Sequence, residues 1–195
     1  FDNSRVECWE ILNNTHPLTT FTSVDTFDAE CFDAFEARYP DDGEDADTTH
    51  LKDVASWLAS TSREAGASIG DTITVSAEVK SDTDTQYQSL FDTYIADGVY
   101  PDTPENRLLK FQKEKWDYFD IYKMAAYYIY LMRFGAVDQV VKNAMLTTEG
   151  TQGVGTHSKW YFINYDNDTV MGLRNDARLV YRYDIDRQTL DESLD

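Results

Sequence analysis

Short apolar runs separated by polar stretches characterise the first part of the chain. Residues 6–12 are apolar and β-prone and lead into a polar turn, and a second short run follows at residues 18–23, so we expect an opening strand pair. Residues 71–85 alternate weakly between apolar and polar positions, which is typical of an exposed strand or a polar linker. The pattern therefore predicts a strand pair at the start of the chain and leaves both alternatives open for residues 71–85.

Two other stretches have apolar residues at helical spacing. Residues 48–65 predict a helix with Thr49 as N-cap, ended by two nearby glycines. In residues 116–134, apolar side chains cover most of the helix circumference, and Gly135 is a natural stop. We expect this second segment to be one long helix, buried on nearly every side, in the middle of a core.

The chain beyond this helix favours a hairpin. Residues 144–148 and 159–165 are strand candidates, joined by a glycine-rich connection that lacks the spacing and the lysine of a phosphate-binding loop. Helices and strands that follow one another in this way indicate an α+β fold. We expect a mixed segment at residues 1–104 and a second segment at residues 105–195, which could also form one continuous domain.

Composition and charge restrict the class of function. The 195 residues include 17 basic and 36 acidic ones, a net charge of −19, which argues against direct nucleic-acid binding. No apolar run is long enough to span a membrane, and no basic, apolar leader is present. A start at Phe1 without Met suggests a piece of a longer polypeptide. Cys8 and Cys31 could pair, but two free thiols are favoured.

Residues 41–47 contain five acidic side chains and no basic one. A run of this kind is typical of a solvated loop. Its alternate aspartates around Gly43 also resemble the oxygen ligands of a calcium loop, although no Glu stands at the bidentate position of an EF-hand. A calcium- or glycan-binding module built on this loop is therefore a third, weaker functional alternative.

The order of polar residues after the predicted buried helix suggests phosphoryl-transfer chemistry. Asp138 is followed five positions later by Asn143, and Asp166 and Asp168 come after the hairpin. Protein kinases arrange their catalytic base and Mg²⁺ ligands in this order. Here Asp138 would be the base, Asn143 and Asp166 (with Asp168 beside them) would hold the metal, and Lys142 would neutralise phosphoryl charge. The same residues could equally cap helices and line turns.

These residues carry a resemblance. The region from about residue 110 to 175, including Asp138 to Asn143 and the run from Trp160 to Asp168, resembles the core of the CotH family of atypical kinases. The resemblance implies a second half similar to the carboxy-terminal lobe of a kinase. The chain departs from that pattern in having no glycine-rich nucleotide loop and no obvious phosphate-gripping lysine in a strand.

Segments 9–15, 35–41, 57–61, 165–169 and 179–181 also resemble large tail proteins of gut phages, including crAss-like phages, that carry a CotH-like domain. The resemblance implies a virion location, other fragments of the same precursor and neighbouring tail proteins as partners, and a homo-oligomeric ring. We expect a proteolytic fragment that acts as a pseudokinase-like scaffold and holds no cofactor. The alternative is an active atypical protein kinase that uses Mg-ATP.

Overall fold

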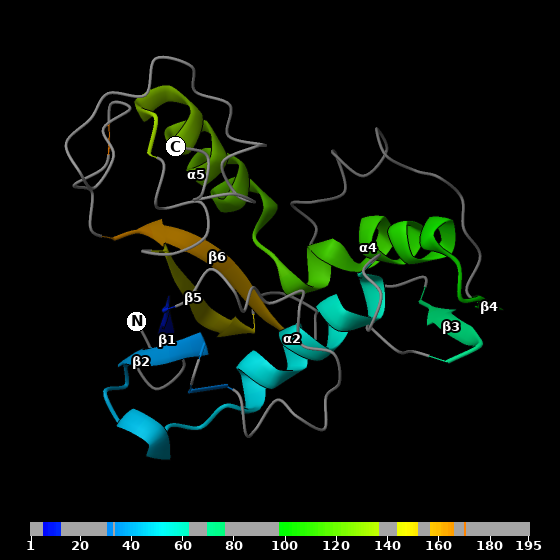
Figure 1. The fold of residues 1–195 in the computed structure, drawn as a ribbon, viewed down its shortest axis with the longest axis horizontal. Coiled ribbons are helices and arrows are strands. Elements are labelled where there is room, and N and C mark those ends of the chain that lie inside the picture. Colours follow the sequence, from blue (N-terminus) through cyan, green and yellow to red (C-terminus); the bar gives the residue numbers. More distant parts are fainter. Residues whose placement is uncertain are drawn as a thin grey trace, which may run out of the picture.

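The computed structural model has an α+β fold, which confirms the predicted class (Figure 1). Its described part contains a four-stranded sheet, a separate two-stranded sheet, three α-helices and a short 3₁₀ turn, η3, at Gly43–Asp45. The structure describes residues 6–12, 31–32, 34–62, 70–76, 98–136, 144–151, 157–165 and 170.

The four-stranded sheet has the order β2-β1-β5-β6, and all neighbouring strands are antiparallel. It combines strands from both predicted segments, because β1 pairs with β5 across most of the sequence. The predicted strand at residues 6–12 and the hairpin are confirmed, residues 18–23 lie outside the described residues, and β2 was not predicted. The strands are β1 (Glu7–Ile11), β2 (Phe35–Tyr39), β5 (Ala144–Thr151) and β6 (Ser158–Asn164).

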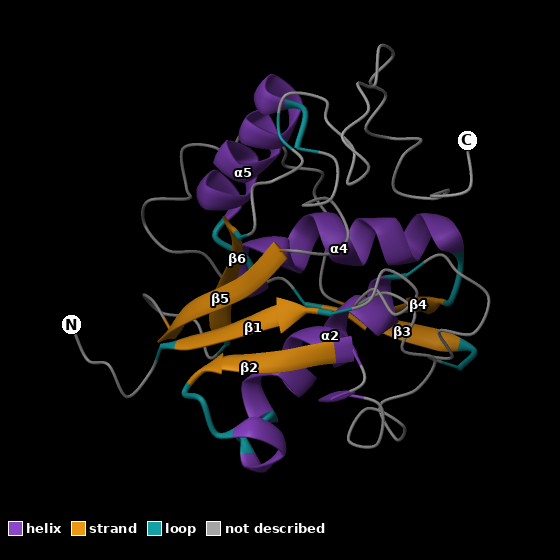
Figure 2. Ribbon diagram, turned by 60° about the vertical axis from the view of Figure 1, so that its left-hand side comes forward, coloured by secondary structure: helices purple, strands orange, loops and turns teal. Residues whose placement is uncertain are grey.

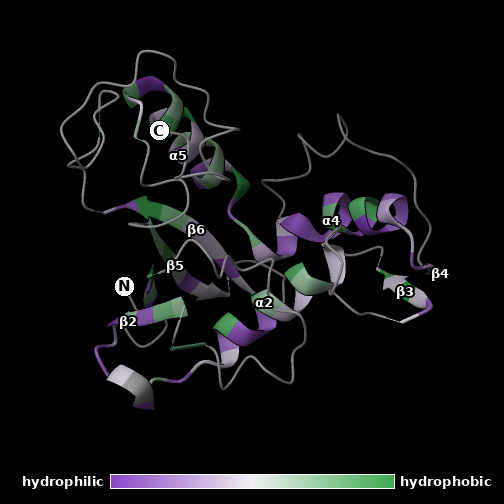
Figure 3. Ribbon diagram, viewed as in Figure 1, coloured by the Kyte–Doolittle hydropathy of each residue, from purple (hydrophilic) through white to green (hydrophobic). Residues whose placement is uncertain are grey.

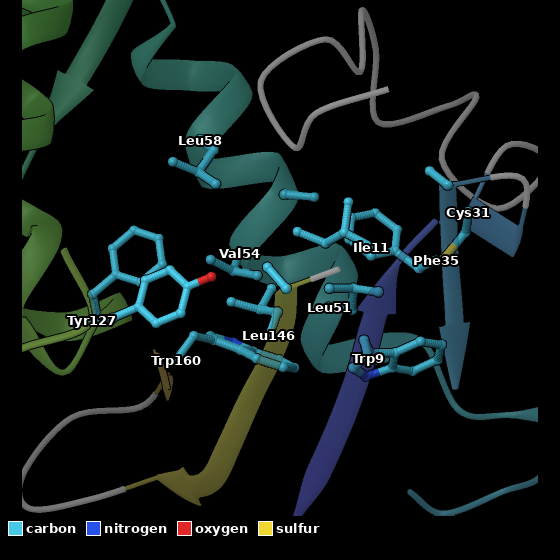
Figure 4. Packing of buried hydrophobic residues seen from close by; sticks show 14 of the residues in the cluster. Trp9, Ile11, Cys31, Phe35, Leu51, Val54, Leu58, Tyr127, Leu146 and Trp160 are labelled. Atoms are coloured by element: carbon cyan, nitrogen blue, oxygen red, sulfur yellow. The ribbon is translucent and has the colours of Figure 1, made fainter. Parts of the chain in front are cut away.

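Helix α2 (Thr49–Thr61) packs its apolar side on one face of this sheet (Figures 2 and 4). Its buried residues Leu51 and Val54 belong to the same hydrophobic cluster as residues of all four strands. Trp9 and Trp160 are among the largest fully buried side chains. The members of the cluster shown in Figure 4 include Trp9, Ile11, Phe35, Leu51, Val54, Leu58, Leu146 and Trp160.

The predicted bounds of this helix were partly wrong. The N-cap is Thr48, and the Oδ1 of Asp47 accepts a hydrogen bond from the backbone N–H of Thr49 at 2.9 Å. At the other end, Ser62 is extended and its carbonyl accepts from Nη1 of Arg107 at 2.6 Å. Because a neighbouring helix binds this carbonyl, α2 ends at Thr61, before the predicted glycines.

The single long helix predicted for residues 116–134 was also wrong. The structure has two helices, α4 (Pro104–Tyr118) and α5 (Ile121–Phe134). Phe119 between them is extended and bridges to Trp160, while the carboxylate of Asp120 accepts from the N–H of Lys123 at 3.1 Å. Asp120 thus starts a new helix as its N-cap instead of continuing the old one.

Burial of α5 differs from the prediction as well. Only Tyr127 and Leu131 are buried, on the side that packs against β6, where the rings of Tyr127 and Phe162 lie 5.5 Å apart. Gly135 ends the helix in the left-handed conformation, as predicted. Figure 3 shows hydrophobic residues along α5. Its exposed large apolar residues are Tyr122, Tyr128, Ile129, Met132 and Phe134.

The two-stranded sheet, formed by β3 (Thr72–Val75) and β4 (Gly98–Pro101), packs on α4. The predicted alternation is confirmed over β3, where Ile73 and Val75 are buried and the threonines are exposed. Residues 77–97 lie outside the described residues. Glu114 of α4 joins these elements, because its buried carboxylate accepts hydrogen bonds from the backbone N–H of Ser76 and from Nε1 of Trp57, both at 2.9 Å.

Candidate functional site

The predicted catalytic and metal-binding residues fall in two segments outside the described residues. Three of these five residues lie in residues 137–143, and the other two lie in residues 166–169. The structure therefore tests neither their positions nor their convergence. The members are Asp138, Lys142 and Asn143 in the first segment and Asp166 and Asp168 in the second.

The described residues next to these segments lie at one end of the β5–β6 hairpin. Ala144, which follows Asn143 in sequence, is the register partner of Asn164, two residues before Asp166. Paired residues of antiparallel strands have Cα atoms about 4.5–5.5 Å apart. The chain thus enters the sheet from the first predicted segment and leaves it toward the second at adjacent positions.

A charged network lies beside this end of the sheet. Arg38 of β2 donates from Nε to Glu10 Oε2 at 2.6 Å, and its Nη1 lies 2.8 Å from Glu36 Oε1. Its guanidinium also lies 5.9 Å from the centre of the Tyr165 ring. The hydrogen bond to Glu10 is the main cause that raises the pKa of Arg38. Arg38 is therefore a fixed positive charge next to the residue that precedes Asp166.

Sequence analysis did not identify Arg38 as a site residue. In the sequence it is one of only two basic residues in an acidic region, and Glu10 lies 28 positions away. The register of β1 and β2 shifts between Cys8 and Trp9. Short-range patterns do not reveal such a shift, so the contact between Arg38 and Glu10 could not be predicted from spacing.

A second cluster attaches α5 to the hairpin. The Nζ of Lys123 lies 3.0 Å from Glu149 Oε1 and 3.8 Å from the centre of the Tyr161 ring, and Tyr161 donates its hydroxyl to the same Glu149 oxygen at 2.8 Å. Burial disfavours the charged form of Lys123, but the hydrogen bond to Glu149 and the neighbouring charges outweigh burial and raise its pKa. Burial and the bond to Glu149 raise the pKa of Tyr161. Tyr161 is therefore a donor and not a base.

Four aromatic rings, from α2, α4 and the residue before β6, form a stack. Trp57 stacks on Phe111 at 5.5 Å and on Tyr118 at 4.3 Å, and Tyr118 stacks on His157 at 4.2 Å. The Nδ1 of His157 lies 2.7 Å from Asp53 Oδ2. Burial, helped by nearby carboxylates, raises the pKa of Tyr118 well above its usual value. The stack joins α2, α4 and the start of β6 and keeps Tyr118 protonated.

The acidic loop at residues 41–47 is largely exposed, as predicted for a solvated loop. Its last carboxylate, Asp47, is engaged with the first turn of α2, and its hydrogen bonds to Thr49 lower the pKa of Asp47. Among the described residues, no group of three or more His, Cys, Asp or Glu side chains is placed to hold a metal ion. Cys8 and Cys31 form no disulfide with each other, which agrees with the favoured prediction of two thiols.

Comparison with known proteins identifies no family for this chain. No family model matches the chain, and no curated protein or solved structure matches it. Within the described ranges, no helix combines the length and the apolar character needed to cross a membrane. The resemblance to the CotH family and to phage tail proteins therefore stays a prediction.

Proposed function

We propose that this chain is a structural component of a phage tail, part of a CotH-like tail protein that acts as a scaffold in tail assembly. One structural observation supports a role in assembly. Helix α5 is apolar around most of its circumference but buries only Tyr127 and Leu131, so it presents apolar surface outward. Exposed apolar surface of this kind is typical of an interaction site.

The internal contacts also suit a scaffold. The Lys123–Glu149–Tyr161 cluster holds α5 on the hairpin, and Glu114 holds α4 on α2 and β3. In the first cluster charged and tyrosine side chains bind one another, and in the second a carboxylate binds an indole N–H and a backbone N–H. Such contacts fix the relative positions of helices and sheets without requiring a substrate.

Purified particles test this proposal. Mass spectrometry of intact particles should recover peptides of this chain in a fixed, multiple copy number and should identify its native termini. An affinity-tagged chain should be located at the tail by electron microscopy. Absence of the chain from particles that contain the other tail proteins would refute the proposal.

One observation favours a second candidate, an active atypical kinase that uses Mg-ATP. The register partners Ala144 and Asn164 stand next to the segments with Asn143 and Asp166, as two metal ligands would require. The full precursor should then label itself with phosphate in the presence of Mg²⁺. The labelling should disappear in an Asp166→Ala variant and persist in an Asp41→Asn control in the acidic loop. Absence of labelling would reject the kinase candidate and leave the scaffold proposal as the remaining one.

A further inference from the structure

The outer face of α5 is a mostly apolar strip that carries one cation. It consists of Tyr122, Ala126, Ile129, Met132 and Arg133, which recur at the spacing of one helix face and are all exposed. Ile129, at its centre, is 58% exposed. Because Leu131 on the opposite side of the helix is buried, the outer face points away from the sheet.

Charge distinguishes this region from the remainder of the chain. Residues 104–134 have six basic and four acidic side chains, whereas the remaining residues have 11 basic and 32 acidic ones. Helix α5 contains Lys123 and Arg133 and no acidic residue. Lys123 is bound to Glu149, so Arg133 is the cation that the outer face offers. An apolar and acidic surface is the complementary partner.

The same chain has such a surface. In the loop of residues 39–47, which we call the acidic pole, Asp42 and Asp45 are exposed, and Tyr39 at its start is 43% exposed. Figures 1 and 2, which differ by a turn about the vertical axis, both place α5 at the top of the molecule and η3 near the bottom. The two complementary surfaces therefore lie at opposite ends of one molecule.

We propose that the outer face of α5 in one copy docks on the acidic pole of a second copy. This inference rests on the proposed scaffold function and names its partner. Two different surfaces meet in such a contact, so it is heterologous, and repetition of it closes a ring or extends a filament. Contact between two outer faces would instead stop at a dimer.

The single contact should be weak. A helix of 14 residues is about 21 Å long and covers only part of the roughly 800 Å² per partner that a stable interface buries. The charged portion should also weaken with salt, because screening shortens the range of interaction between exposed charges. Assembly in a particle would strengthen it by holding neighbouring copies together.

Sedimentation velocity of the full chain tests the proposal with two variants. Ile129→Glu places an acidic group in the outer face, and the double variant Asp42→Asn/Asp45→Asn removes two charges of the acidic pole without creating a basic surface. In a concentration series that reaches about 0.2 mM, the wild-type chain should associate. Each variant alone should associate with itself at least about tenfold more weakly. Mixed together, the two variants should form a dimer that does not grow, because each supplies the surface that the other lacks.

A matched control is Val99→Glu, which adds the same charge at an exposed position of β4, 67% exposed and away from both surfaces. It should associate as wild type does. Arg133→Glu is a second variant of the outer face for the case in which Ile129→Glu unfolds. A wild-type chain that stays monomeric throughout, or a pole variant that associates as well as wild type, would overturn the proposal.

The outcome is independent of the test for the tail function. Recovery of the chain from particles, together with failure of the two variants to complement each other, would reject this contact and keep the tail assignment. If the two variants complement each other in solution but particles lack the chain, the contact is kept and the tail assignment is rejected.

Discussion

Removal of the Glu114 carboxylate is the most informative change to the fold. This carboxylate is buried and accepts hydrogen bonds from Trp57 Nε1 and from the Ser76 N–H, and Lys110 Nζ lies 2.8 Å from its Oε2. Glu114→Ala leaves two donors without their acceptor. Lys110 keeps a hydrogen bond to the carbonyl of Thr74 at 2.8 Å, so the loss of Glu114 leaves its ammonium group with one partner.

The expected cost follows from these contacts. A buried donor left without a partner costs about 1–3 kcal/mol, and removal of one member of a buried ion pair costs about 3–5 kcal/mol. Because these contributions overlap, we expect Glu114→Ala to lower the free energy of unfolding by about 3–5 kcal/mol. Glu114→Gln keeps one acceptor oxygen and should cost about 1–3 kcal/mol.

Denaturant and thermal unfolding measure the effect. For a chain of this size, 1 kcal/mol corresponds to about 2–4 °C, so the alanine variant should melt about 10 °C lower. The control is Glu105→Ala in the first turn of the same helix, where the carboxylate is exposed. Loss of its interaction with the helix dipole should cost at most about 1 kcal/mol.

A double-mutant cycle identifies the contact responsible. Trp57→Phe removes the indole donor, and its effect should be smaller in the Glu114→Ala background than in wild type, with a coupling free energy of about 1 kcal/mol. If Glu114→Ala is as stable as the Glu105→Ala control, or if the two changes are additive, the carboxylate does not join α2 to α4 as we infer.

Three further predictions concern stability and reactivity. Leu131→Ala should cost about 2–5 kcal/mol in denaturant unfolding, because Leu131 is the most buried residue of α5. The hydrogen bond from Arg107 lowers the pKa of Asp102. The ionised carboxylate therefore stabilises the fold above its unfolded pKa of about 3.9, and this stabilisation is lost as the pH falls through the lower folded pKa. Asp102→Asn should flatten the acid limb of a stability–pH curve, and an unchanged limb would contradict this. In the native chain iodoacetamide should label Cys8 slowly, because burial raises its pKa, and should spare the fully buried Cys31; equal labelling by mass spectrometry would contradict the described burial.

Local patterns in the sequence were sufficient for several elements. Weak alternation favoured a strand or a linker at β3, and helical spacing predicted α2, because in both elements one face is buried and the other is exposed. Two strand candidates on either side of a glycine-rich connection predicted the β5–β6 hairpin. The start of α4 also has a local signal that was missed. Thr103 caps it and Pro104 occupies its first turn, which is a common N-terminal pattern.

Other features depend on contacts between distant segments. Asp120 lies among apolar residues that recur at helical spacing, so sequence alone does not decide between a helix interior and an N-cap. The hydrogen bond from the N–H of Asp120 to the carbonyl of Trp160 decides it, and that partner is 40 residues away. For the candidate site, the sequence predicted residues that the structure leaves undescribed, whereas the described Arg38 network depends on the register of β1 and β2.

The apolar circumference of α5 connects the sequence with the proposed assembly. Its pattern predicts burial on all sides, yet the described fold buries one side and leaves Ile129 58% and Met132 45% exposed. Full burial of such side chains is worth about 1.5–3 kcal/mol each, so these two retain about half of that as unrealised free energy. A second copy docked on the outer face would recover it. A helix whose pattern predicts burial on all sides, but which is buried on one side only in the single chain, is therefore what a subunit of a larger assembly should show.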